Sequence, residues 1–163
     1  QVIRSKEALM KIEEIMSKDP SCCMPEDDVE VAAEIMRRLD TGFVPVTQDL
    51  SQPSKLVGVI TDRDLCLGVV AAGKERTSMR VGEIMSTKLT VCKPTETAEQ
   101  ALARMKRAKV RRIPVVNRDF EVIGIVSMAD IVRHHAVSNT EIFKTLNAIC
   151  TPTKAARTKA EAA

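Results

Sequence analysis

The sequence predicts a mixed α/β (α+β) fold of two β-α-β-β-α repeats, followed by an extra C-terminal helix. Three observations predict this fold. The 163-residue chain repeats its own pattern at a nearly fixed spacing. Within each copy, the apolar residues alternate between the spacing of strands and that of helices. Hydrophobic residues make up 44% of the chain, which is enough for a packed core, although aromatic residues make up only 2%.

The repeat is visible by self-comparison. "EIMS" at 14–17 recurs as "EIMS" at 83–86, an offset of 69 residues. Farther along, Asp64 corresponds to Asp130 at an offset of 66 residues. The missing three residues fall in one polar loop, because "TQDLSQPSKL" has ten residues where "VNRDFEV" has seven. An insertion confined to a loop is expected of two copies of one fold.

In the first repeat, a short strand is expected at residues 21–23, and Pro25 with the acidic residues after it opens a helix. Two strands follow at 43–46 and 56–60, and a second helix begins after Thr61. The first helix carries apolar residues at helical spacing, namely Val29, Ala32, Ala33, Met36 and Leu39.

The second repeat follows the same order, with a short strand at 90–92, a helix after Pro94, strands at 112–116 and 122–126, and a helix after Ser127. The matching apolar positions of its first helix are Ala98, Ala101, Leu102, Met105 and Ala108.

A last helix is predicted at 139–150, with Asn139 or Thr140 as its cap. Its apolar face is expected to contain Ile142, Phe143, Leu146, Ile149 and Cys150. The predicted parts of the chain are a first repeat at 11–73, a second repeat at 80–137, this helix, and a mobile tail at 151–163.

The ordered set "IMS", Pro, Ala, Met, an apolar residue before "PV", and Gly-apolar-apolar-Thr/Ser-x-x-Asp occurs twice. It resembles the CBS domain, and two such domains in tandem resemble a CBS pair, or Bateman module. The segment "FKTLNAICTP" is also similar to small stand-alone bacterial CBS-pair proteins of the hypoxic-response type. The resemblance implies two pseudo-symmetric units packed through their sheets. It also implies adenine-nucleotide binding in clefts between them, and dimerisation of the pair.

The resemblance also implies a set of ligand-binding residues. Asp64 and Asp130 would accept hydrogen bonds from ribose hydroxyls, and Thr61 and Ser127 would lie near a phosphate. The other residues that the resemblance implies are apolar residues beside the adenine and polar residues of the first strands: Val44, Pro45, Ile113, Pro114, Ser21 and Thr90. The cations come from the sequence itself: Arg63 lies inside the first motif, and Arg111 and Arg112 end the basic segment 104–112, which is either a solvated helix face or a positive mouth of the second cleft. Ala129 replaces Arg63 in the second copy, so the two clefts are expected to differ.

A structural explanation stands beside the ligand site. Thr61-x-x-Asp64 and Ser127-x-x-Asp130 each fit a capping box, which stabilises a helix by about 1 kcal/mol without any ligand. The sequence therefore leaves two functions open. One is a regulatory module that senses an adenine nucleotide through a ligand-linked conformational change. The other is a structural or interaction protein of CBS fold that binds no nucleotide.

Other classes of function are disfavoured. No catalytic constellation or metal cluster is present in the sequence, so we expect no enzyme and no required cofactor. AMP, ADP or ATP is the expected ligand, ahead of NAD or S-adenosylmethionine. The net charge of +3 and the absence of Trp and Tyr argue against nucleic acid. His134 and His135 are adjacent and therefore point apart on a helix, with His135 expected to pack inward.

The remaining expectations concern location and assembly. Five cysteines without a disulfide framework indicate reduced thiols in a cytoplasmic protein. No apolar run is long enough to span a membrane. A homodimer is expected because the second helix of the first repeat carries apolar residues on more than one side. A regulated partner protein of unknown identity is expected as well.

Overall fold

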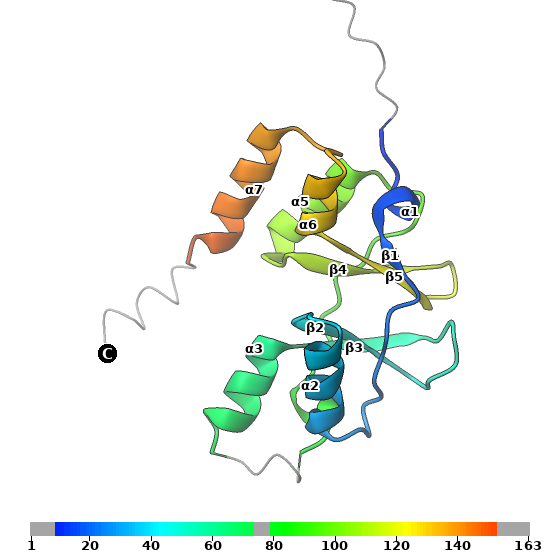
Figure 1. Ribbon diagram of the computed structural model, residues 1–163, viewed down its shortest axis with the longest axis vertical. Helices are drawn as coiled ribbons and strands as arrows, with labels where there is room; N and C mark the ends of the chain where they lie inside the picture. The colour runs from blue at the N-terminus through cyan, green and yellow to red at the C-terminus, as the bar shows by residue number, and fades with distance from the viewer. Residues whose placement is uncertain (1–8, 74–78, 153–163) are drawn as a thin grey trace, which may run out of the picture.

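The computed structural model of the chain describes residues 9–73 and 79–152 (Figure 1). The predicted mobile tail lies outside these residues from 153 onward. The elements occur in the order α1 (Ile12–Ile15), β1 (Ser17–Lys18), α2 (Val29–Arg38), β2 (Phe43–Thr47), β3 (Leu56–Thr61), α3 (Asp62–Leu65) with its π-helical continuation η1 (Cys66–Val70), α4 (Val81–Ile84), α5 (Ala98–Ala108), β4 (Arg112–Val116), β5 (Val122–Ser127), α6 (Met128–Arg133) and α7 (Asn139–Cys150).

The two predicted hairpins form the centre of the molecule, which confirms the mixed fold of two repeats. Strands β2 and β3 pair antiparallel in one sheet, and β1, β5 and β4 form the other. Strands β3 and β5 alternate between buried and half-buried residues, as expected for a sheet with two different faces. Helices α2 and α3 lie on the outer side of the first sheet, and α5, α6 and α7 on the outer side of the second (Figure 1).

The three-residue difference between the repeats lies where the sequence predicts it. The loop between β2 and β3 spans 48–55, whereas the loop between β4 and β5 spans 117–121. Each loop follows a register shift at the end of its hairpin, so the paired cores of the two hairpins remain equivalent.

The hydrophobic cores are built across the two repeats. Ile12 and Ile15 of α1 are buried among residues of the second repeat, including Leu102 and Val126. Conversely, Val81 of α4 is buried with residues of the first repeat, including Val46. The leading segment of each repeat thus crosses to the other unit, and the two units interlock.

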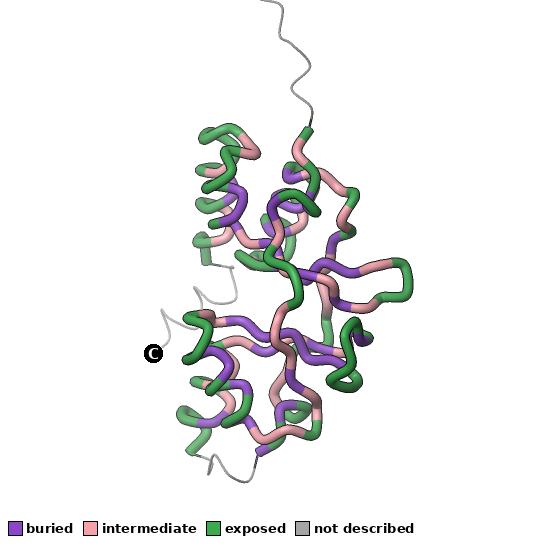
Figure 2. Tube along the Cα trace, turned by 45° about the vertical axis from the view of Figure 1, so that its right-hand side comes forward, coloured by how far each residue is buried: buried purple, intermediate pink, exposed green. Residues whose placement is uncertain are grey.

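The sheets also meet directly, along the middle of the molecule where buried residues concentrate (Figure 2). Leu56 N donates to Phe120 O (3.1 Å) and Val122 N donates to Ser54 O (2.9 Å). Leu56, Val122 and Val116 form a buried apolar cluster beneath these bonds. The two hairpin ends therefore hold the repeats together through both backbone and side-chain contacts.

Several local expectations are wrong. Residues 21–23 and 90–92 form isolated parallel bridges to β2 and β4 rather than full strands. Helix α7 is capped by Ser138, whose hydroxyl accepts from Glu141 N, instead of by the two residues that follow it.

The burial of three predicted apolar sets also differs in part. In α2, Ala33 is exposed and Ile35 is buried, and Leu39, the residue after this helix, is exposed; in α5, Ala108 is exposed. In α7 only Ile142 and Ile149 pack on the core, and Thr145 rather than Phe143 is buried. His135 is exposed because the helix has ended there, with φ at 51°. Among the described residues, no helix is long and apolar enough to cross a membrane.

Candidate functional site

Both hydroxyl–acid pairs form complete capping boxes. Thr61 ends β3, and its hydroxyl accepts from Asp64 N (3.2 Å). The Asp64 carboxylate reaches back and accepts from Thr61 N (2.9 Å) and Thr61 Oγ1 (2.7 Å). The first repeat therefore contains the capping box that its sequence motif predicts.

The second repeat repeats these contacts and adds an ion pair. The Asp130 carboxylate accepts from Ser127 N (2.8 Å) and Ser127 Oγ (2.6 Å) through one oxygen. Its other oxygen accepts from the guanidinium of Arg133. Asp130 is buried, with 5% of its surface exposed, whereas the Arg133 side chain is 68% exposed. Leu67 stands at the position in the first repeat that matches Arg133, so Asp64 has no equivalent arginine.

The strand register brings the other predicted residues of the first repeat to the same end of its hairpin. Val44 pairs with Ile60, the residue before Thr61, and Pro45 pairs with Val59. Cys23, two residues after Ser21, forms a parallel bridge with Val46, two residues after Val44. The segment that carries Ser21 therefore runs beside β2.

The second repeat has the same arrangement. Ile113 pairs with Val126, the residue before Ser127, and Pro114 pairs with Ile125. Cys92, two residues after Thr90, forms the matching bridge with Val115. Val44, Pro45, Ile113 and Pro114 are all buried, so their contribution to a cleft would come through backbone and apolar surface.

Two arginines lie beside the second hydroxyl–acid pair. Arg112 is the direct cross-strand partner of Ser127, and Arg111 O accepts from Met128 N (2.9 Å) at the start of α6. Directly opposed residues of an antiparallel pair have Cβ atoms about 4.5–5.5 Å apart on one face of the sheet. Both arginines are exposed. Their side chains are therefore free to reach an anion near Ser127.

The first repeat has no such pair of arginines. The matching positions are Gly42 and Phe43, and Phe43 is buried opposite Thr61. Gly42 is packed so closely that an added Cβ would come 2.5 Å from Asp62 Oδ2. Arg63 is exposed one residue later.

The two hairpin ends therefore differ in charge. The first holds one arginine and two acids, Arg63, Asp62 and Asp64, which sum to −1. The second holds three arginines and one acid, Arg111, Arg112, Arg133 and Asp130, which sum to +2. The end of the second repeat is therefore the more positively charged of the two.

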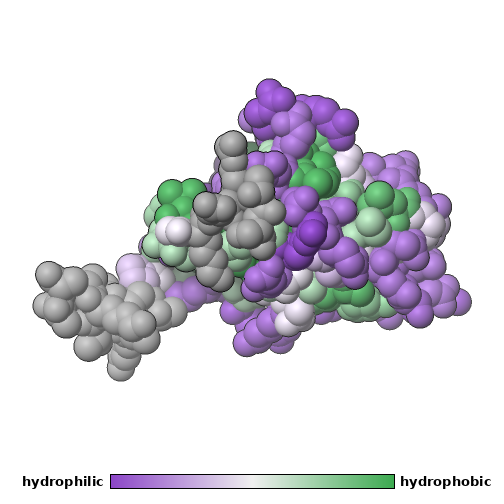
Figure 3. Space-filling view, turned by 90° about the horizontal axis from the view of Figure 1, so that it is seen from below, coloured by the Kyte–Doolittle hydropathy of each residue, from purple (hydrophilic) through white to green (hydrophobic). Residues whose placement is uncertain are grey.

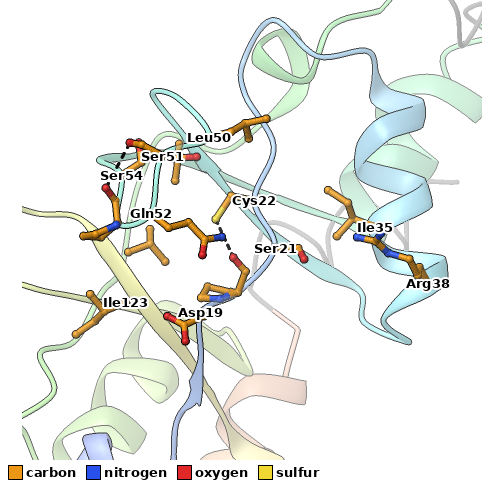
Figure 4. Close-up of a pocket in the computed structure, with 14 residues that line it drawn as sticks. Asp19, Ser21, Cys22, Ile35, Arg38, Leu50, Ser51, Gln52, Ser54 and Ile123 are labelled. Atoms are coloured by element: carbon orange, nitrogen blue, oxygen red, sulfur yellow. Dashed lines mark hydrogen bonds between the residues drawn. The ribbon is translucent and has the colours of Figure 1, made fainter.

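A cavity of about 490 Å³ lies between the repeats, close to the first hairpin loop (Figure 4). Ser21 is the predicted residue that lines it, together with Cys22, Arg38 and Ile123 of β5. The loop from Leu50 to Ser54 forms one wall of the cavity. The sequence analysis does not predict that these loop residues line a cavity. The three-residue insertion in this loop does indicate that the two repeats differ here.

The cavity and the charged end of the second repeat lie at opposite ends of strand β5. Ile123, near the start of the strand, lines the cavity, and Ser127 is its last residue. Ile123 and Ser127 point to one face of β5, and four residues of strand span about 13 Å. The hydroxyl–acid pairs do not line the cavity itself. The structure therefore places the cluster of Ser127, Asp130, Arg111 and Arg112 at a separate position from this cavity.

The cysteines provide neither a disulfide nor a metal site in the described part of the chain. All five are free thiols. Burial raises the pKa of Cys22 to about 11, and the pKa values of Cys23 and Cys92 to about 12. Residues 9–73 and 79–152 contain no group of three or more His, Cys, Asp or Glu side chains that could hold a metal ion.

A comparison with known protein families finds a match to both repeats. The CBS domain family matches residues 12–70 and 81–136. The chain belongs to the CBS domain family. Hypoxic response protein 1 of Mycobacterium tuberculosis is 30% identical over 139 residues, which covers 85% of this chain and 93% of that protein. The chain is thus similar to a stand-alone CBS-pair protein over nearly its whole length, as the resemblance implied.

Solved CBS-pair structures extend the comparison. A crystal structure of hypoxic response protein I with two coordinated zinc ions has a TM-score of 0.68 and 30% identity, covering 77% of this chain and 98% of that one. The CBS pair of protein MJ0100, in complex with 5-methylthioadenosine and S-adenosyl-L-methionine, has a TM-score of 0.69 and 25% identity, covering 78% and 96%. CBSX2 in complex with AMP has a TM-score of 0.65 and 25% identity, covering 77% and 96%.

Proposed function

We propose that the protein is a regulatory module that binds an adenine nucleotide, AMP, ADP or ATP, at the end of the second repeat. The observation that carries the proposal is the register of β4 and β5, which sets Arg112 opposite Ser127 and Arg111 beside the start of α6. Hydrogen bonds to charged groups contribute about 1.5–3 kcal/mol each, so these arginines can favour a phosphorylated ligand. CBS pairs similar to this chain bind AMP or S-adenosyl-L-methionine, which supports the ligand class.

Asp130 would accept hydrogen bonds from the ribose hydroxyls in this proposal. One of its oxygens is occupied by Ser127 and the other by Arg133. The exposed Arg133 side chain would turn away to release the carboxylate oxygen, and would then add a further cation near the phosphate. Nucleotide binding would therefore exchange one ion pair for another.

Occupancy would reach the rest of the molecule through the interlocked repeats. Strand β5 carries Ser127 and also pairs with β1, and its first residue bonds to Ser54 of the other hairpin. A ligand shifts the relative arrangement of the repeats only as far as its affinity differs between the arrangements. A partner protein that binds one arrangement better would sense the nucleotide.

A thermal melt with AMP, ADP, ATP, NAD and S-adenosylmethionine tests the proposal. At one hundred times its dissociation constant, a ligand adds about 2.7 kcal/mol to the free energy of unfolding. We expect at least one of the three adenine nucleotides to raise the melting temperature in this way. Flat melts with all five compounds would overturn the proposal.

The complete capping boxes favour a second candidate, a structural or interaction protein of CBS fold that binds no nucleotide. Thr61–Asp64 and Ser127–Asp130 are satisfied by their own helix starts. This candidate predicts flat melts together with a concentration-dependent oligomer, so the same experiment distinguishes the two.

The proposal extends to catalysis, location and assembly. We expect binding without turnover, since a carboxylate that holds a ribose is not placed to act on a phosphate. A cytoplasmic location is supported by the five free thiols. A homodimer is expected from apolar surface that the chain leaves exposed on its second helix, including Leu67 and Val70.

A further inference from the structure

Asp130 has one carboxylate oxygen left for a ligand, and Arg133 occupies it. Within residues 9–73 and 79–152, Asp130 is the one charged residue that is buried. Its Oδ2 atom accepts from Ser127 N and Ser127 Oγ in the capping box. Its Oδ1 atom accepts from Nη2 of Arg133, the only cation that pairs with it in the described part of the chain. A ribose hydroxyl that donates to this oxygen must therefore displace the arginine.

The two partners of this ion pair are held very differently. The Asp130 side chain is 7% exposed and is fixed by two hydrogen bonds from Ser127. The Arg133 side chain is 68% exposed, and among the described residues its guanidinium bonds to Asp130 alone. An exposed arginine loses conformational freedom when it holds such a pair, so the pair is easily exchanged for another. The arginine is thus the partner that moves.

The first repeat shows that the capping box does not need this arginine. Leu67 takes the matching position, and within the described residues the Asp64 carboxylate is bonded to Thr61 alone. Leu67 is 52% exposed, so this position faces solvent in both repeats. Seen from the end of the molecule where α2 and α3 lie, hydrophobic patches interrupt a largely hydrophilic surface (Figure 3). The fold therefore accepts an apolar residue here, and helix capping does not explain Arg133.

We propose that Arg133 competes with the ribose for Asp130 and thereby makes the second hairpin end selective for phosphorylated adenine ligands. The inference rests on the proposed function, because it concerns the same site. A ligand that takes Asp130 Oδ1 breaks the ion pair and leaves the guanidinium without its partner. A phosphate replaces that partner, whereas adenosine offers no group that can. The competition thus lowers the affinity for adenosine more than the affinity for a nucleotide.

The displaced guanidinium stays close to the proposed phosphate position. Ser127 Oγ lies 2.6 Å from one oxygen of the Asp130 carboxylate, and Arg133 binds the other oxygen of the same group. Arg112 lies directly opposite Ser127 on β4. A phosphate beside Ser127 is therefore within the surroundings of both arginines. The planar guanidinium donates pairs of parallel hydrogen bonds to phosphate oxygens, so it forms a strong second ion pair there.

Titration calorimetry of the full chain with adenosine, AMP, ADP and ATP tests the proposal. The test variant is Arg133→Leu, which introduces the residue of the first repeat, and the charge-matched control is Arg118→Leu in the loop between β4 and β5. Arg133→Leu should bind adenosine about tenfold more tightly than the wild type, because no charged hydrogen bond has to be displaced. It should bind the tightest of the three nucleotides no better than the wild type, since it has lost a cation together with the competitor. Arg118→Leu should bind adenosine as the wild type does.

Arg133→Gln serves as a second variant, because glutamine removes the charge but can still donate a hydrogen bond to the buried carboxylate. It should change adenosine binding in the same direction, and a thermal melt shows that each variant is folded. Unchanged or weaker adenosine binding by the folded variants, while the wild type binds a nucleotide, would overturn the proposal and leave the proposed function intact. If neither the wild type nor the variants bind any of the four compounds, the proposed function fails and this inference fails with it.

Discussion

At the scale of single residues, the hydroxyl–acid pairs serve as helix caps in both repeats, and what distinguishes the repeats lies around them. Asp64 and Asp130 make the same bonds to Thr61 and Ser127. Their neighbours differ, because the second repeat carries arginines where the first has Gly42, Phe43 and Leu67. A capped carboxylate keeps a fixed orientation, which also suits it to accept a ligand's hydroxyl.

The cysteines separate into two classes by burial. Burial raises the pKa of Cys22 to about 11, and a hydrogen bond with Thr47 lowers it only in part. Burial raises the pKa of Cys23 and Cys92 to about 12, with further contributions from Asp27 and Glu96 respectively. At pH 8 these three thiols are protonated and shielded, and thiolates are the reactive form.

Iodoacetamide at pH 8 should therefore modify Cys66 and Cys150 rapidly, and all five cysteines only after denaturation. Intact-mass spectrometry over time checks this expectation. Rapid modification of three or more sites in the native protein would contradict it.

The same shifts set a dependence of stability on alkaline pH. The folded state keeps these thiol protons up to pH values of about 11 and 12, whereas ordinary thiols lose them near 9.0. Above about pH 9 the folded state therefore binds more protons than the unfolded state. The free energy of unfolding should fall as the pH rises from about 9 to about 12.

At the scale of elements, the order of strands and helices was predictable, because hydrophobic spacing and the duplicated Gly-to-Asp motif depend on local sequence. The exchange of α1 and α4 between the two cores was not. Ile12 and Val81 look like ordinary apolar residues of their own repeat, and only the tertiary fold decides which core they join.

The candidate site was also predictable from the sequence only in part. Thr61, Asp64, Ser127 and Asp130 were identifiable because their motif is contiguous in sequence. The closeness of Arg112 to Ser127 depends on the strand register, and the ion pair of Asp130 with Arg133 depends on side-chain conformation. Hydrophobic spacing predicts one apolar face of α7 that includes Phe143, whereas Phe143 is exposed, because spacing alone does not show which apolar residues of a helix meet the core.

Two matched glycines test how the sheets are built. A Cβ added to Gly124 would come 2.9 Å from Ser17 O, a backbone atom held by the pairing of β1 with β5. A Cβ added to Gly58 would meet the flexible side chain of Met85 at 2.5 Å, with no backbone atom among the three nearest. Overpacking costs about 1–3 kcal/mol where the neighbour cannot move.

Gly124→Ala should therefore lower the free energy of unfolding by about 1–3 kcal/mol, and Gly58→Ala by less. Urea denaturation of the two variants and the wild type measures the difference. Equal losses, or a larger loss for Gly58→Ala, would show that β1 does not fix the second sheet in this way.

At the scale of the whole molecule, pseudo-symmetry is broken in three places. The first hairpin loop is longer and forms a wall of the cavity near Ser21. The end of the second repeat is positively charged, and helix α7 covers the outside of the second repeat alone. The two repeats therefore differ in the charge of their hairpin ends and in the surface that their outer helices expose.

The central claim is that an adenine nucleotide binds beside Arg112. Isothermal titration of wild type, Arg112→Ala and the charge-matched control Arg118→Ala, each with AMP, ADP and ATP in turn, tests it most directly. Arg118 is an exposed cation in the loop between β4 and β5. We predict saturable binding to the wild type and the control. Binding to Arg112→Ala should be about tenfold to a hundredfold weaker, since a charged hydrogen bond contributes about 1.5–3 kcal/mol. An absence of saturable binding of all three nucleotides to the wild type, or equal affinities of the three proteins for the nucleotide that binds, would contradict the claim.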